Sequence, residues 1–178
     1  MNWEEFTKDV VAAARQSFSE LLAQHGDETF YAFVLYTDED CWTIVPAANS
    51  LEQYQAKMAR LKKHDPQNLA YYKWASAEWA YEAYAAAPFN TICEQLSEAS
   101  PKGKAAYATF KANVHAAMTD ALKVLDREGF FGKHRDGAAL FITSSDDDGA
   151  EAMEDNSAKL LNRPEIYEPF LKRYDVMN

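Results

Sequence analysis

Cysteine, glycine and proline are scarce in this chain, and it has no long apolar run. Its 178 residues include two Cys, six Gly and six Pro. Cys41 and Cys93 lie far apart without a paired spacing, which argues against a disulfide framework and favours a reducing, cytoplasmic compartment. No stretch approaches the roughly 18 apolar residues of a membrane helix. The first residues also lack the basic and apolar segments of a secretory signal, so we expect neither a membrane span nor a signal peptide.

Acidic residues outnumber basic residues in this chain. The chain has 28 Asp and Glu against 18 Lys and Arg, a formal net charge of −10 at pH 7. Such a charge repels phosphate backbones, so a nucleic-acid partner is not expected. Apolar residues make up 48% of the chain and aromatic residues 13%, which excludes disorder. The length suits one domain over residues 1–178.

The hydrophobic pattern predicts an α+β fold, with a small antiparallel sheet of three to four strands flanked by several helices. Helices are expected over residues 3–22, 50–64, 76–87, 89–99 and 101–128, and after a capping box at Asn162–Glu165. Strands are expected over residues 30–36, 41–45 and 138–143, with Pro46 ending the second. The short aromatic segment Tyr71–Trp74 is a candidate for the remaining strand. The first strand is apolar on both faces and is therefore expected inside the sheet.

The motifs of common enzyme sites are missing. The chain has no His-Glu-x-x-His, Cys-x-x-Cys, Gly-x-Ser-x-Gly or phosphate-binding Gly-rich segment. Its histidines, His25, His64, His115 and His134, are scattered, and His115 is expected to be a half-buried histidine beside the apolar stripe of a helix. No catalytic residue, metal ligand or cofactor is assigned. Because triads can assemble from distant residues, catalysis stays open, although the sequence favours a non-enzymatic protein.

The segment from Thr143 to Lys159 holds a concentration of acids without an intervening base. It follows an apolar run that reads as a buried strand, so we expect an acidic loop at the end of that strand. A negative patch beside a rigid element attracts a cation or a basic protein surface. The predicted protein-binding residues are Asp146, Asp147, Asp148, Glu151, Glu154 and Asp155.

Calcium is an alternative ligand for this loop. With Ser144 as first ligand, Asp146, Asp148 and Asp155 take the third, fifth and twelfth positions of a calcium loop. The match is incomplete, because the first position is Ser where Asp is usual, and the twelfth is Asp where a bidentate Glu is usual. A strand also precedes the loop instead of a helix. A solvated acidic loop without a ligand is a further alternative.

A second candidate site combines tryptophans with carboxylates. Glu78 and Glu82 lie four residues apart, and on a helix they would share a face beside Trp74 and Trp79. Carboxylates packed against indole rings can acquire a raised pKa and serve acid–base catalysis on a sugar or similar substrate. Core packing is the competing interpretation, because aromatic stripes at helical spacing are usually buried.

A series of short motifs resembles a known family. It comprises Phe30–Phe33, Leu35–Asp38, Lys73-Trp74, Glu78-Trp79, Tyr81-Glu82, Leu140–Thr143, Asp146, Ser157 and Leu161-Asn162. Over roughly residues 3–174 the chain resembles an uncharacterised bacterial family, a domain of unknown function. The resemblance implies no established activity. Bacterial families of this size and make-up often serve as immunity or accessory proteins of toxin systems, which is an analogy at the level of the fold.

The leading hypothesis is an acidic, non-enzymatic bacterial protein-binding domain, of the immunity type, that inhibits a basic toxin. Its partner would be a basic protein, with no nucleic acid and no membrane, and a homo-oligomer stays open. The alternative is a small-ligand-binding protein or hydrolase that uses Glu78 and Glu82 beside Trp74 and Trp79.

Overall fold

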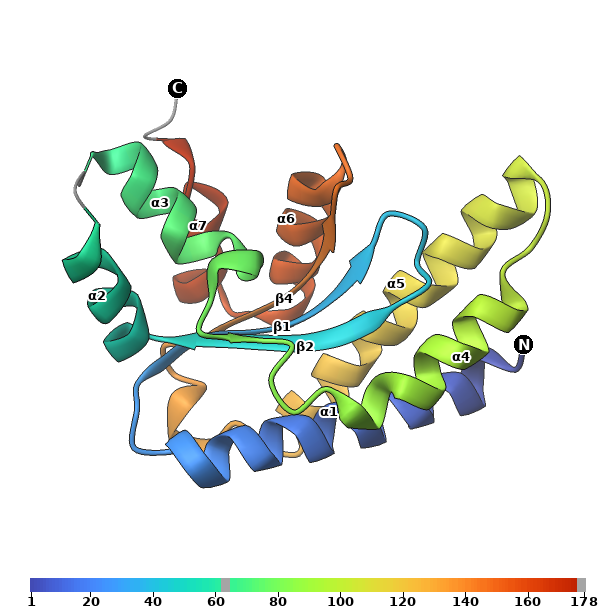
Figure 1. The fold of residues 1–178 in the computed structure, drawn as a ribbon, viewed down its shortest axis with the longest axis horizontal. Helices are drawn as coiled ribbons and strands as arrows, with labels where there is room; N and C mark the ends of the chain where they lie inside the picture. The colour runs from blue at the N-terminus through green and yellow to red at the C-terminus, as the bar shows by residue number, and fades with distance from the viewer. Residues whose placement is uncertain (62–64, 176–178) are drawn as a thin grey trace.

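The computed structural model describes residues 1–61 and 65–175 and has one sheet between two layers of helices (Figure 1). The strands are β1 (Phe30–Asp38), β2 (Ile44–Ser50), β3 (Tyr81–Glu82) and β4 (Ala139–Ser145). The helices are α1 (Trp3–His25), α2 (Leu51–Arg60), α3 (Pro66–Trp74), α4 (Asn90–Ala99), α5 (Lys104–Arg127), α6 (Ala150–Leu161) and α7 (Pro164–Leu171). Short 3-10 turns are η1 (Ser76–Glu78), η2 (Ala87–Phe89) and η3 (Gly132–His134).

The strand order in the sheet is β3-β2-β1-β4. The strands β1 and β2 form the expected antiparallel hairpin, whereas β4 pairs parallel to β1. The α+β class with a small four-stranded sheet is therefore confirmed, but the sheet is mixed and not antiparallel throughout as expected. A parallel pair needs a long crossover, and here the chain from α2 to α5 supplies it. As predicted, β1 lies inside the sheet.

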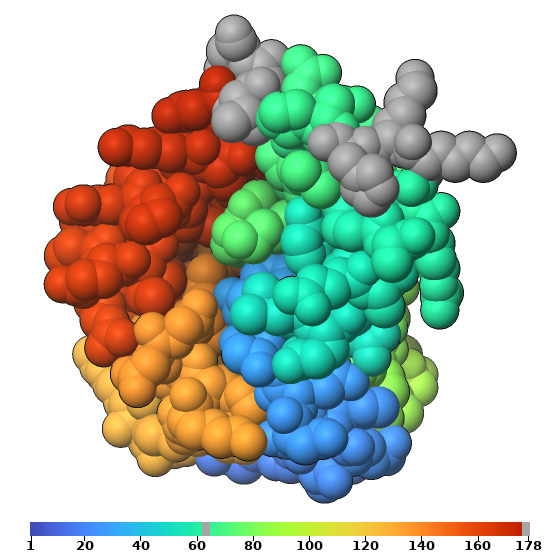
Figure 2. Space-filling view, turned by 90° about the vertical axis from the view of Figure 1, so that its left-hand side faces the viewer, coloured from blue at the N-terminus to red at the C-terminus, as the bar shows by residue number. Residues whose placement is uncertain are grey.

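Two apolar cores cover the two faces of the sheet. The helices α1, α4 and α5 pack on Phe33, Leu35 and Leu140, while α6 and α7 pack on Val34 and Phe141. Near the start of β1, side chains do not alternate regularly between the two faces of the sheet. The pairing of β1 with β2 has an irregularity there, between Phe30 and Ala32. On the second face α3 lies beside α7 (Figure 2). The rings of Trp74 and Phe170 are 5.1 Å apart.

Two expectations for residues 65–87 are wrong. The segment Tyr71–Trp74 is not a strand but the end of α3, because Asp65 accepts a hydrogen bond from Asn68 N at 2.9 Å and Pro66 occupies the first helical turn. The helix expected over residues 76–87 is also absent. Instead η1 leads into β3, the short edge strand, which pairs with Ala47 and Ala48 of β2.

Several element boundaries differ from expectation. The strand β2 starts at Ile44 and continues through Pro46 to Ser50. Proline is tolerated there because β3 pairs only further along β2, so the outer side of Pro46 has no partner strand. The long helix starts at Lys104, three residues later than expected, and Gly129 follows its end with φ +70°. The predicted helix over 50–64 ends at Arg60, and its positions 62–64, with His64, lie outside the described residues.

Candidate functional site

The parallel pairing of β1 and β4 brings two acidic segments together. Asp38, the last residue of β1, is in register with Ser145, the last residue of β4. The turn after β1 carries Glu39 and Asp40. The connection after β4 carries Asp146, Asp147 and Asp148, and Glu151 follows in the first turn of α6. We call this group the acidic end of the sheet; it consists of Asp38, Glu39, Asp40, Asp146, Asp147, Asp148 and Glu151.

Part of the acidic end is bonded within the protein. Asp38 accepts hydrogen bonds from Trp42 N at 3.1 Å and Thr43 N at 2.8 Å. Asp40 accepts one from the Tyr107 hydroxyl at 2.6 Å. Asp147 accepts a bond from Gly149 N and pairs with Lys111 at 3.4 Å, and these contacts lower the pKa of the Asp147 carboxyl. These three acids therefore shape the turns as well as adding charge.

The other acids of the acidic end face solvent. Glu39, Asp146, Asp148 and Glu151 are exposed, and they form no hydrogen bond through their carboxylates with any other described residue. Trp42 lies beside Asp38 with 51% of its surface exposed. Its indole Nε1 donates to Ser100 Oγ at 3.3 Å, which together with the backbone bond to Asp38 orients the ring. An oriented, exposed tryptophan among acids is suited to contact with another protein.

Glu154 and Asp155 do not belong to this surface. The expected loop ends at Gly149, and from Ala150 onward these acids lie on α6. There Arg173, near the end of the described chain, pairs with Glu154 at 2.7 Å and with Asp155 at 2.5 Å. Glu154 is 9% exposed. The six acids predicted from the sequence are thus divided between a surface and an internal ion-pair network.

The calcium alternative loses its twelfth ligand through the same contacts. The Asp155 carboxylate instead accepts a hydrogen bond from Arg173. Within residues 1–61 and 65–175 no group of three or more His, Cys, Asp or Glu side chains is arranged to hold a metal ion.

The structure also joins two residues that are distant in the sequence. Cys41 Sγ lies 3.4 Å from His115 Nε2, and Lys111 and Asp147 are the charged neighbours. Burial is the main cause that raises the pKa of the Cys41 thiol to about 11, and burial also lowers the pKa of His115. Because Cys41 is 0% exposed, the pair is suited to packing and not to nucleophilic attack. No spacing in the sequence indicated this contact.

We expect the two thiols to react at very different rates. In the native protein at pH 8, iodoacetamide should modify the half-buried Cys93 at least about 100-fold faster than Cys41, because Cys41 is buried and its raised pKa leaves little thiolate. Peptide mass mapping after timed alkylation measures both rates. The Cys93→Ser variant should stay unmodified until urea unfolds it. Rapid native labelling of Cys41 would contradict the packing role.

The tryptophan–carboxylate candidate is divided as well. Glu78 lines a groove of about 470 Å³ with Trp79, Lys57 and Arg60, and it pairs with Lys57 at 2.5 Å. Glu82 is exposed on β3, where it accepts a hydrogen bond from the Tyr36 hydroxyl. Trp79 is 5% exposed, and its indole donates to Lys73 O.

Trp74 packs on Tyr31 and Phe170 outside this groove. The groove therefore presents one carboxylate, Glu78, and Lys57 neutralises its charge. Glu78 and Glu82 do not face one substrate together, as acid–base catalysis by two carboxylates requires.

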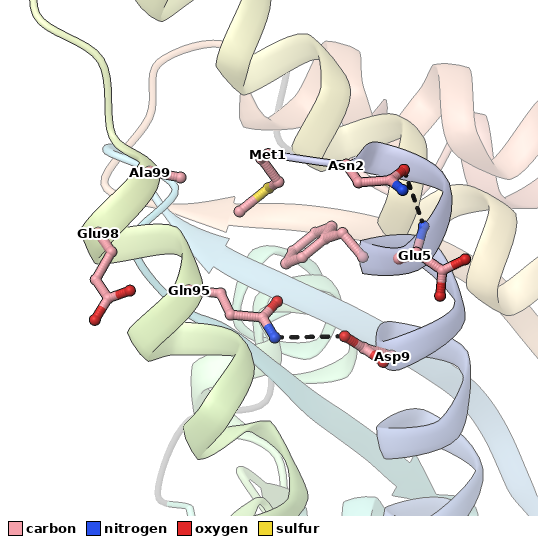
Figure 3. Close-up of a pocket in the computed structure, with 8 residues that line it drawn as sticks. Met1, Asn2, Glu5, Asp9, Gln95, Glu98 and Ala99 are labelled. Carbon is pink, nitrogen blue, oxygen red and sulfur yellow. Dashed lines mark hydrogen bonds between the residues drawn. The ribbon is translucent and has the colours of Figure 1, made fainter.

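A cavity of about 390 Å³ lies between α1 and α4 (Figure 3). Its polar side chains are mainly Glu5, Asp9 and Glu98, and Gln95 donates to Asp9 across it at 3.4 Å. The residues that line the cavity include no lysine, arginine, histidine, serine, threonine or cysteine, so no catalytic pair forms with these carboxylates there.

Residues of the resemblance motif cover the open edge of β4. Asn162 Oδ1 accepts from Leu140 N at 2.9 Å, and its Nδ2 donates to Leu140 O at 2.7 Å. One step along the strand, Ser157 Oγ accepts from Ile142 N at 3.0 Å. The side chains thus replace a neighbouring strand and keep the edge from pairing with other chains. The capping box predicted for Asn162 is wrong, because this side chain bonds β4 instead of capping α7.

The comparisons agree with the resemblance. No helix in the described ranges is long and apolar enough to cross a membrane. No curated protein and no solved structure matches the chain. Residues 10–163 match the family described as a domain of unknown function, DUF4303. That match spans most of the chain, from the third turn of α1 to the residue before α7, so this protein belongs to the DUF4303 family.

Proposed function

We propose that this protein is a non-enzymatic binding domain whose acidic end covers a basic surface of another protein, as an immunity-type inhibitor does with a toxin. The supporting observations are the exposed carboxylates of the acidic end, Glu39, Asp146, Asp148 and Glu151, and the exposed Trp42, which Asp38 and Ser100 orient. Complementary charge speeds association and rejects wrong partners, and a tryptophan at the centre of a contact supplies binding energy.

A nuclease toxin is the partner class that fits this surface. Its active site must be basic because it binds a phosphate backbone, and carboxylates spaced along two adjacent loops can occupy such a site. A cytoplasmic location is part of the proposal. It agrees with Cys41 and Cys93 both being free thiols, as is usual in a reducing compartment.

Charge reversal tests the proposal. The triple variant Glu39→Lys, Asp148→Lys and Glu151→Lys should lose its basic partner, with association slowed about tenfold or more, because these carboxylates face solvent and attract the partner over distance. The measurement is quantitative mass spectrometry of proteins captured by the tagged chain from a lysate of its own organism. Captured proteins should be released at high salt. Coexpression with the captured protein then shows whether the chain relieves its toxicity.

The matched control is Glu20→Lys, Glu94→Lys and Glu168→Lys. These acids are exposed on α1, α4 and α7, and this variant changes the net charge by the same amount. It should capture the partner like the unaltered protein. Equal capture by both triple variants would show that the acidic end has no special role and would contradict the proposal.

A further inference from the structure

A second groove begins beside the acidic end and runs between α5 and α6 over the edge strand β4. Its volume is about 520 Å³. The apolar side chains that line it include Ala116 of α5, Ile142 of β4, and Met153 and Leu160 of α6. Lys111 lies one helical turn before His115 on α5, and it donates a hydrogen bond to Asp147 of the acidic end. The groove and the acidic end are therefore contiguous.

The Leu160 side chain does not contribute to the core of the protein. It is 69% exposed, whereas its neighbour Leu161 is 6% exposed and packs inside. Met153, also on α6, is only partly buried. Methionine adapts its shape to an incoming apolar group, and a leucine side chain gains substantially when it is removed from water. An apolar side chain of another molecule would bury both.

The charge of the surroundings favours a basic occupant. Asp120 is the acidic side chain among those that line the groove, and burial lowers the pKa of His115. At the end of the groove nearest the loop, Lys111 joins α5 to Asp147 of the acidic end, and the exposed Asp146 and Asp148 lie on either side of Asp147 in the chain. An occupant with lysine or arginine on either side of an apolar residue would meet carboxylates at both places.

We propose that this groove receives an apolar side chain from a basic segment of the partner protein, while the flanking basic residues bind Asp120 and the acidic end. This inference rests on the proposed function and adds the chemistry of the segment recognised. The acidic end supplies attraction over distance, and the groove supplies selectivity for a large aliphatic residue at the contact.

Two synthetic helical peptides of equal length and charge test the inference. One has lysine on one face and leucine on the other, and in the second every leucine is replaced by serine. The protein should bind the lysine–leucine peptide about tenfold more tightly at low salt, because only this peptide can bury an aliphatic side chain in the groove. Calorimetric titration gives the two dissociation constants, and the Met153 methyl resonance should shift with the first peptide alone.

Variants test whether the groove causes the preference for the lysine–leucine peptide. Leu160→Ser combined with Met153→Ser should bind the two peptides equally. The control Tyr71→Ser removes a different exposed apolar side chain, 43% exposed on α3, and should keep the tenfold preference. If the preference survived in the groove variant, the groove would not be the receptor. Self-association that disappears with Leu160→Ser, without any peptide preference, would identify a second copy as the occupant and overturn the inference.

The outcomes separate this inference from the proposed function. Equal, salt-sensitive binding of both peptides that is lost on charge reversal of the acidic end would overturn the groove and leave the acidic end supported. Failure of both peptides to bind would also overturn the groove. The proposed function would then be decided by the capture experiment alone.

Discussion

Replacing Arg173 with methionine is expected to destabilise the protein by about 3–5 kcal/mol, the usual cost of removing one partner from a buried ion pair. The Arg173 side chain is 1% exposed and contacts two carboxylates, Glu154 and Asp155. It also donates to Phe170 O at 3.1 Å and stacks on the Phe170 ring at 4.1 Å. Methionine retains part of this packing, so the loss arises mainly from the buried charge left on Glu154.

Chemical denaturation at pH 7 measures this loss. The control Arg163→Met removes a solvent-exposed pair with Asp136, in which the Arg163 side chain is 53% exposed, and should change stability by less than about 1 kcal/mol. Adding Glu154→Gln to Arg173→Met removes the unpaired charge and should recover a large part of the loss. An Arg173→Met variant as stable as Arg163→Met would show that the network does not hold α6 to the end of the chain.

The loss should depend on pH in a defined direction. Burial raises the pKa of Glu154, against the opposing effects of Thr143 and Arg173. Without Arg173 that pKa rises further above its unfolded value. A carboxyl whose folded-state pKa is raised loses stability as pH rises through the range between the two values. The deficit of Arg173→Met should therefore be smaller near pH 4 than at pH 7.

The second large effect is expected for Asn162→Leu, at about 2–4 kcal/mol. Leucine has nearly the same shape but leaves the outward N–H and C=O of Leu140 without partners, and each buried unsatisfied group costs about 1–3 kcal/mol. Asn162 Nδ2 also donates to Ala158 O at 2.8 Å. The variant should in addition aggregate more readily, because an uncovered edge strand can pair with another chain.

Hydrogen exchange at the Leu140 amide gives a local measure of this change, and denaturation and light scattering give the global ones. Asn156→Leu is the matched control, because Asn156 is an exposed asparagine on α6, the helix that ends directly before Asn162, and its effect should stay within about 0.5 kcal/mol. Unchanged protection of the Leu140 amide in Asn162→Leu would refute the edge-covering role.

The errors in the sequence interpretation have physical causes. Tyr71–Trp74 is short and aromatic, which suits a strand as well as a helix, and its helical state depends on the Asp65 cap and Pro66 at its start. Asn162 precedes Pro164 as a capping residue would, but β4 lies beside it and offers stronger partners. In both places the local pattern allowed two structures, and bonding elsewhere selected one.

The acidic residues were also predicted only in part from the sequence. The sequence identified Asp146, Asp148 and Glu151, which do face solvent. It could not separate them from Glu154 and Asp155, because their cation, Arg173, comes 18 or more residues later. It also could not add Glu39, because the β1 turn reaches the acidic end only through parallel pairing with β4.

Local patterns in the sequence were sufficient to predict the α+β class, the long helices α1 and α5, the interior position of β1, and the negative charge. These follow from periodicity and composition, which act over a few residues and do not depend on what packs nearby. Three features could be read only from the folded chain: which acids stay exposed, which thiol contacts a histidine, and how the edge of β4 is covered. Those outcomes depend on contacts between distant segments, and burial with hydrogen bonding in the folded chain selects among alternatives that are equal in the sequence.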